Sequence, residues 1–133
     1  MSSGVRKNDA TVAMRFVANS RLFVQLLSWR LSKSMVDENL IYKALANPFR
    51  REILRWLKTP DKYFVRGSID LGCGVATNAI HARSGLSQST VSVHVAALIE
   101  AGLLVSTRVG QWMFLSRNED VIRAFAAGIR LHL

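Results

Sequence analysis

Residues 85–103 decide the fold, and they read GLSQSTVSVHVAALIEAGL. Gly85 can adopt the left-handed backbone that ends one helix, and Ser87 can cap the next helix through its hydroxyl oxygen. Leu86 lies between them and is expected to fill the gap between the two helices. The stretch therefore predicts a helix, a short turn and a second helix, which Gly102 ends.

The second helix of this stretch has two different faces. Val91, Val95 and Leu98 recur at spacings of four and three residues, as the core residues of a helix do. An ordinary solvent-facing helix carries Glu and Lys opposite such a stripe. Here the opposite side is small or polar, comprising Gln88, Ser89, Ser92, Val93 and Ala96. This face suits a DNA major groove, where its polar side chains can bond base edges.

Capping and breaking residues predict three helices before the turn. Asp37 can cap a short helix, and Asn47-Pro48 ends it and begins the next one. Thr59-Pro60 stops that second helix, and a third runs from about residue 77 to 84. Residues 61–75 carry three glycines and little periodicity, so they predict a loop, with a small strand as the alternative.

The segment after the second turn helix predicts a hairpin and a last helix. Residues 104–108 and 111–116 alternate around Val109-Gly110, a pattern typical of a β-hairpin. Asn118 can cap a final helix with acidic residues in its first turn. The order of elements predicts a mainly α protein with a winged helix-turn-helix, of five to six helices and a two-stranded wing.

The composition favours an anionic partner. The 133 residues include 18 Lys and Arg against 9 Asp and Glu, a formal charge of +9. Such a charge attracts nucleic acid or an acidic membrane surface. The single cysteine excludes an intrachain disulfide and a cluster of several thiolates, and fits a reducing, cytoplasmic location. Half of the residues are hydrophobic, enough for the core of one domain.

The N-terminal segment, residues 1–35, has an apolar stripe behind Asp9, a candidate N-cap. The stripe favours a helix in a core or a dimer interface. The segment is also rich in Arg and Ser and poor in acids, as targeting segments and membrane-contacting helices are. Its longest arginine-free stretch, Leu22 to Trp29, is too short to span a bilayer. No stable membrane association is therefore expected.

Two long motifs resemble those of a known family. Residues 44–54, ALANPFRREIL, are similar to the "ALA[DN]PxRxxIL" helix of ArsR-type transcriptional regulators. Residues 85–103 resemble the recognition helix of that family, and residues 108–112, RVGQW, resemble its wing. The resemblance covers roughly residues 40 to 115, with the motifs in the family's order.

The resemblance implies a homodimeric repressor that binds double-stranded DNA at an inverted-repeat operator. It places the DNA contacts in the recognition helix and wing, at Ser87, Gln88, Ser89, Thr90, Ser92, Val93, His94, Thr107, Arg108 and Gln111. It places the dimer interface in the first and last helices, at Phe16, Phe23, Leu27, Leu31, Phe125 and Ile129. The domain of residues 1–133 then consists of a dimerisation helix in 1–35, a winged-helix core in 37–116 and a second dimerisation helix in 118–133. Val93 departs from the family, where Arg is common, which changes the expected base preference.

The metal ligands of many family members have no equivalents here. The family's Cys-x-Cys pair aligns with Ala76 and Asn78, neither of which replaces a thiolate. No metal or other cofactor is therefore expected, and any inducer is unidentified. The only thiol, Cys73, is either a loop or core residue or a redox-reactive group.

Three hypotheses for the function follow. The first is a sequence-specific DNA-binding repressor. The second is a redox-responsive regulator that uses Cys73, and the third is a peripheral membrane protein that uses residues 1–35. An enzyme is not expected, because the sequence has no Gly-rich phosphate loop, nucleophile motif or ligand cluster.

Overall fold

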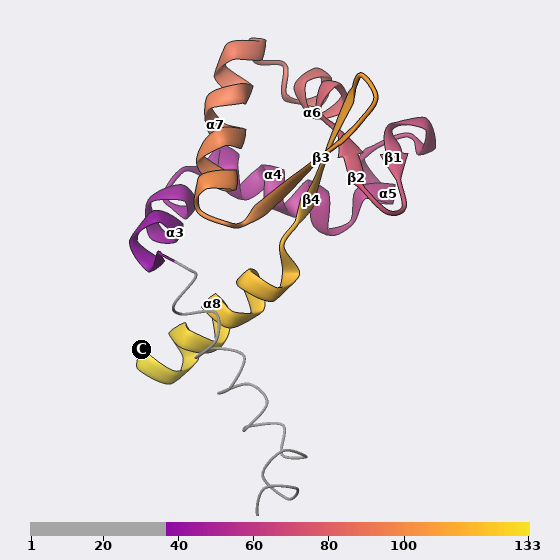
Figure 1. Ribbon diagram of the computed structural model, residues 1–133. Coiled ribbons are helices and arrows are strands. Elements are labelled where there is room, and N and C mark those ends of the chain that lie inside the picture. Colours follow the sequence, from indigo (N-terminus) through magenta and orange to yellow (C-terminus); the bar gives the residue numbers. More distant parts are fainter. Residues whose placement is uncertain (1–36) are drawn as a thin grey trace, which may run out of the picture. The chain divides into compact units, whose positions relative to one another are not determined.

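The computed structural model describes residues 37–133 (Figure 1). The predicted N-terminal helix lies outside the described residues, together with its expected dimer contacts Phe16, Phe23, Leu27 and Leu31. The described chain contains six α-helices and a four-stranded antiparallel sheet, the architecture of a winged helix. Residues 37–122 form one compact unit, and residues 123–133 belong to another.

The helices before the turn begin where the capping residues predict. Helix α3, Glu38–Leu45, is capped by Asp37, whose carboxylate accepts hydrogen bonds from the N–H groups of Asn39 and Leu40. Asn47 caps helix α4, Pro48–Lys58, in the same way. Each cap satisfies donors that a helix leaves unpaired at its N-terminus.

The turn between α6, Thr77–Ser84, and α7, Gln88–Glu100, has the predicted backbone. Gly85 has a φ of 68°, a left-handed conformation that is sterically unfavourable for a residue with a Cβ. The Ser84 hydroxyl donates to the His81 carbonyl and accepts from the Leu86 N–H, which ties the turn to α6. The prediction that Leu86 fills the gap between the helices is wrong, because its side chain stays 41% exposed.

The sheet is larger than the predicted two-stranded wing. The wing strands β3, Leu104–Val109, and β4, Trp112–Arg117, pair as expected, with Gly110 and Gln111 in the turn. Two further strands, β1, Ile69–Asp70, and β2, Gly74–Ala76, extend the sheet in the order β1-β2-β4-β3. They lie in the segment predicted as a loop, for which a small strand was the alternative. The same segment also holds the short helices α5, Pro60–Tyr63, and η1, Arg66–Ser68.

Gly74 allows β2 to approach β4. Its φ is +105°, and a Cβ at this position would lie 2.0 Å from the Leu115 carbonyl oxygen. Val75 can then pair with Leu115, and Ala76 with Phe114. The glycine is therefore required both by the backbone conformation and by the space beside it.

The core of the main unit joins the helices to the sheet. Its fully buried side chains come from α3, α4, β2, α6, α7, β4 and the residue before β3: Ile41, Ile53, Val75, Ile80, Leu98, Leu115 and Leu103. Burying each such aliphatic side chain contributes about 1.5–3 kcal/mol. These contacts hold α7 and the wing on one common scaffold.

The last helix, α8, spans Glu119–His132 and begins as predicted. The Asn118 side chain accepts a hydrogen bond of 3.3 Å from the Val121 N–H. Arg117 forms a bidentate ion pair with Glu119 in the first turn, with its shorter contact at 2.7 Å. Phe125 and Ile129, expected in the dimer interface, lie four residues apart on this helix.

Candidate nucleic-acid interface

Helix α7 separates its core face from its polar face as the sequence predicts. Val91 is 5% exposed and Leu98 is fully buried, so this side holds the helix on the core, whereas Val95, predicted on the same side, is only half-buried. The opposite residues Gln88, Ser89 and Ser92 are exposed, and Val93 is 63% exposed. The exposed face therefore offers an amide, two hydroxyls and a small apolar surface, which are groups that match base edges and the thymine methyl.

Three hydroxyl groups meet at the N-terminus of α7. Ser87 Oγ accepts a hydrogen bond of 3.2 Å from the Thr90 N–H, and it lies 2.7 Å from Thr90 Oγ1 and 3.2 Å from Ser89 Oγ. Ser87 and Thr90 are therefore engaged in the cap. Their first role is to fix the start of α7, which aims the exposed face.

His94 packs against α4. Its Nδ1 accepts a hydrogen bond of 3.0 Å from Arg50 Nε, and its ring stands edge-on to Phe49 at a centroid distance of 5.1 Å. Burial and, secondarily, the charge of Arg50 lower the pKa of His94 below its ordinary value. His94 thus joins α7 to α4 as a neutral imidazole, an arrangement that the sequence does not reveal because 44 residues separate the pair.

The wing offers an exposed cation near its tip. Arg108 and Gln111 are exposed at its tip, whereas Thr107 is half-buried and pairs with Phe114 across the hairpin. The Arg108 guanidinium makes no hydrogen bond or ion pair with the part of the chain that the structure describes. It is available for a phosphate group, in the bidentate geometry that guanidinium allows.

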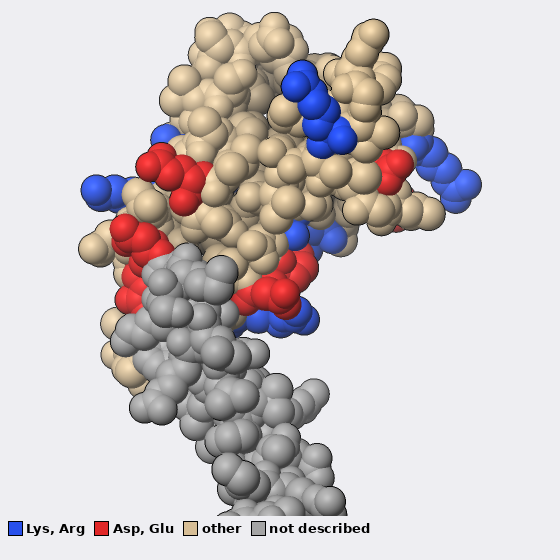
Figure 2. Space-filling view, in the orientation of Figure 1, with Lys and Arg blue, Asp and Glu red and all other residues tan. Residues whose placement is uncertain are grey.

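The three arginines of α4 have partners within the described chain. Arg51 donates a hydrogen bond of 2.6 Å to the Leu45 carbonyl, and Arg55 forms a 2.7 Å ion pair with Glu52. Figure 2 shows that the surface around α7 and the wing is mostly uncharged, with basic side chains scattered around it. The exposed groups of this surface are therefore mainly neutral.

Arg83 has a structural role that the sequence analysis missed. It donates a hydrogen bond of 2.9 Å to the Tyr63 carbonyl, and its guanidinium lies 4.9 Å from the centre of the Tyr63 ring and 5.2 Å from that of Trp56. These contacts tie α6 to the segment after α4. The aromatic residues of that segment were the feature of the sequence that could have indicated these contacts.

A groove of about 530 Å³ lies between α6, α7 and β4. Gln88 and Ser92 line it from α7, and Met113 lines it from the wing strand. Two residues proposed to contact bases thus face the space between the helix and the wing.

The Cys73 thiol lies beside the Asp70 carboxylate, and its pKa is raised. Burial raises its pKa, and the hydrogen bond to Asp70 and the negative charge of that carboxylate raise it further. Backbone N–H groups of Gly72 and Cys73, and the Cys73 side chain, lower the pKa of Asp70 in turn. Because the thiolate is the reactive form, this environment slows oxidation.

Ala76 and Asn78, aligned above with the Cys-x-Cys pair of ArsR-type regulators, lie where β2 leads into α6. Ala76 is buried at the end of β2, and Asn78 is exposed on α6. Within residues 37–133 there is no group of three or more side chains suited to hold a metal ion. No helix in that range is both long and apolar enough to cross a membrane.

The chain is similar to a bacterial regulator. It is 36% identical over 88 residues to the "Uncharacterized HTH-type transcriptional regulator YbzH" of Bacillus subtilis (strain 168). The match covers 65% of this chain and 88% of that protein. No family model matches the chain. The helix-turn-helix with its wing and this similarity together show that the chain belongs to the helix-turn-helix transcriptional regulators.

Proposed function

We propose that the protein is a homodimeric repressor of the ArsR type, which binds an inverted-repeat operator with α7 in the major groove. The relative is a transcriptional regulator by name, and membership of that class supports DNA binding. The operator, the dimer and the repressing role go beyond that similarity and form the proposal.

The observation that carries the proposal is the exposed face of α7. Gln88, Ser89 and Ser92 stand at the exposed start of a helix whose other side is buried in the core. A surface helix without function would gain solubility from charged residues there. The only formal charges from Ala76 to Val105 are Arg83 and Glu100, which cancel. Arg108 on the wing supplies the phosphate attraction that this face lacks.

The proposed dimer uses Phe125 and Ile129 on α8 and the apolar stripe of residues 1–35. Two copies related by a two-fold axis present two α7 helices to successive major grooves. An operator of matching symmetry then follows from the geometry of the dimer.

Selection of bound duplexes from a random DNA library tests the proposal. The full chain should enrich two half-sites in inverted orientation, with centres about 10 base pairs or a multiple of this apart. A reporter gene placed behind the enriched sequence should then be less active when the protein is present. A library that stays random after several rounds, at both low and moderate salt, would contradict sequence-specific binding.

A further inference from the structure

A second cavity lies beside the wing, and Asn78 lines both this cavity and the α7 groove. It has a volume of about 350 Å³ and is lined by Gly67, Ser68, Ala76, Asn78, Trp112 and Phe114. This volume is at the lower end of the range for small-molecule sites. Trp112 and Phe114 alternate along β4, so both face this cavity, whereas Met113 between them faces the α7 groove.

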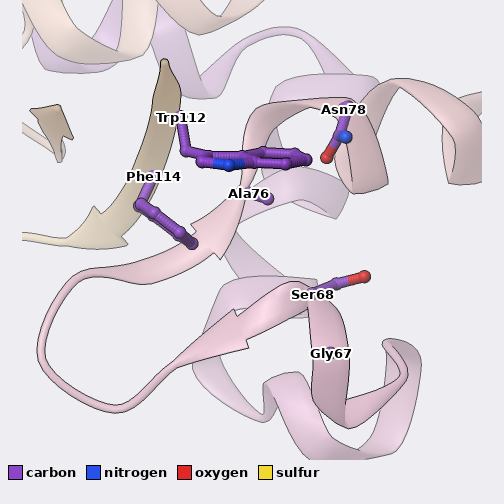
Figure 3. Close-up of a pocket in the computed structure, with 6 residues that line it drawn as sticks. All are labelled: Gly67, Ser68, Ala76, Asn78, Trp112 and Phe114. Carbon is purple, nitrogen blue, oxygen red and sulfur yellow. The ribbon is translucent and has the colours of Figure 1, made fainter. Parts of the chain in front are cut away.

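An aromatic ring forms one wall of the cavity. Figure 3 shows the Trp112 indole edge-on, with Ala76 beneath it, Phe114 to one side and the Asn78 amide near its outer edge. Ser68 and Gly67 lie across the cavity from the indole. Trp112 is 57% exposed, so part of its ring is accessible to a ligand.

The polar groups around the ring are unused. Neither the Asn78 amide nor the Ser68 hydroxyl makes a side-chain hydrogen bond to another residue between 37 and 133. A carboxamide offers a donor and an acceptor side by side, the pattern that pairs with the edge of an adenine base. An indole face offers stacking to any planar ring, worth about 1–3 kcal/mol per base.

We propose that this cavity binds a free planar heteroaromatic compound with a neighbouring donor and acceptor, of the purine-base type. The compound stacks on Trp112, and its polar edge bonds Asn78 and Ser68. The cavity carries no charged side chain, which favours a neutral ligand.

Such a ligand would act on the wing. Trp112 is the first residue of β4 and pairs with Val109 across the wing turn, whereas Asn78 lies in the first turn of α6. A compound held by both links the wing to the helix that leads into α7. This regulatory part rests on the proposed function, since it requires that the wing and α7 bind DNA together.

Titration calorimetry of the full chain with adenine tests the site without DNA. Adenine should bind with a stoichiometry of one per chain. Trp112→Ala and Asn78→Ala should each weaken binding at least about tenfold. The first removes the surface on which the ligand stacks, and the second removes the amide that bonds its polar edge. Met113→Ala is the matched control, since it changes the neighbouring exposed residue on the other face of β4, and should leave binding within about twofold. Indole, which stacks but has no acceptor, should bind at least about tenfold more weakly than adenine.

Three outcomes would overturn the site. They are no binding at about 1 mM adenine, equal binding to the Trp112 and Asn78 variants, and indole binding as tight as that of adenine. A base within DNA carries the same chemistry as free adenine. If Trp112→Ala weakened duplex binding but left adenine binding unchanged, this would therefore contradict the proposal that the cavity binds a free ligand.

The regulatory part has its own measurement. Saturating adenine should change the dissociation constant for the selected duplex at least about threefold, and the duplex should change adenine affinity by the same factor. Adenine that binds without this change would contradict regulation but leave the site intact. Failure to find any selected duplex would contradict the proposed function alone.

Discussion

At the scale of single residues, His94 shows how one hydrogen bond can make folding depend on pH. Its imidazole must stay neutral to accept from Arg50, and its pKa is held below the ordinary 6.5. As the pH falls through 6.5, His94 becomes protonated in the unfolded chain but stays neutral in the folded chain. The stability associated with His94 is therefore fully present above this pH and is lost as the pH falls towards the lowered pKa.

We expect the free energy of unfolding to fall between about pH 7.5 and about pH 5.5, measured by urea denaturation. His94→Gln, which keeps a side-chain acceptor for Arg50, should flatten this dependence. His81→Gln, on α6, is the control and should preserve it. A His94 variant with the same slope as the original chain would show that His94 is not the source.

Cys73 allows a second prediction at this scale. Because the Asp70 carboxylate helps to raise the pKa of the thiol, Asp70→Asn should lower that pKa while keeping the side-chain oxygen that accepts from Gly72 and Cys73. We expect Asp70→Asn to speed alkylation by iodoacetamide at neutral pH by about threefold or more. Asp61→Asn, on the exposed helix α5, should leave the rate unchanged. Equal rates in both variants would contradict the role given to Asp70.

At the scale of elements, the sequence predicted the helices well because their signals are local. The side chains of Asp37, Asn47, Ser87 and Asn118 bond N–H groups two or three residues away, so each helix start can be read from a few neighbouring residues. The wing was also predicted, although its turn lies one residue further on, at Gly110-Gln111.

Elements that depend on distant partners were not predicted. Strand β2 has three residues, and its pairing of Val75 with Leu115 joins positions 40 residues apart, so no local pattern marks it. The same reason hides the contact of Arg50 with His94 and that of Arg83 with Tyr63. The candidate site was therefore predicted in its exposed residues but not in the contacts that hold them in place.

Gly74 provides the test of the extended sheet. Gly74→Ala would place a Cβ 2.0 Å from the Leu115 carbonyl oxygen on a backbone with φ +105°. We expect a loss of about 3 kcal/mol or more in the free energy of unfolding, because β2 must move away from β4. Gly67→Ala is the matched control, since no atom lies within 4 Å of its added Cβ. It should change stability by less than about 0.5 kcal/mol, and an equal effect of both changes would contradict the account of β2.

At the scale of the whole molecule, the proposed dimer sets the total charge that attracts DNA. A formal charge of +9 per chain becomes +18 in a dimer, and long-range attraction to phosphate grows with it. Since the described face of α7 is neutral, we expect this charge to raise general affinity and the polar contacts of α7 to discriminate between sequences.

Sedimentation equilibrium of the full chain should give twice the 14.8 kDa mass of one copy. Ile129→Glu should shift the chain towards monomer, because it places a charge in the proposed interface on α8. Ala126→Glu, at an exposed position of the same helix, should leave the dimer intact. A single-copy mass for the original chain at micromolar concentration would contradict the proposed dimer.

The central claim is that the neutral face of α7 reads DNA sequence while the wing contributes attraction. The most direct measurement is the ratio of the dissociation constants for a scrambled and a selected duplex at physiological salt. The ratio should be about 10³ or more for the original chain and should fall at least about tenfold when Gln88→Ala and Ser92→Ala are combined. Arg108→Ala should weaken binding to both duplexes equally and reduce the salt slope by about 1. A ratio near one for the original chain, or an equal loss on both duplexes in the α7 double variant, would contradict the claim.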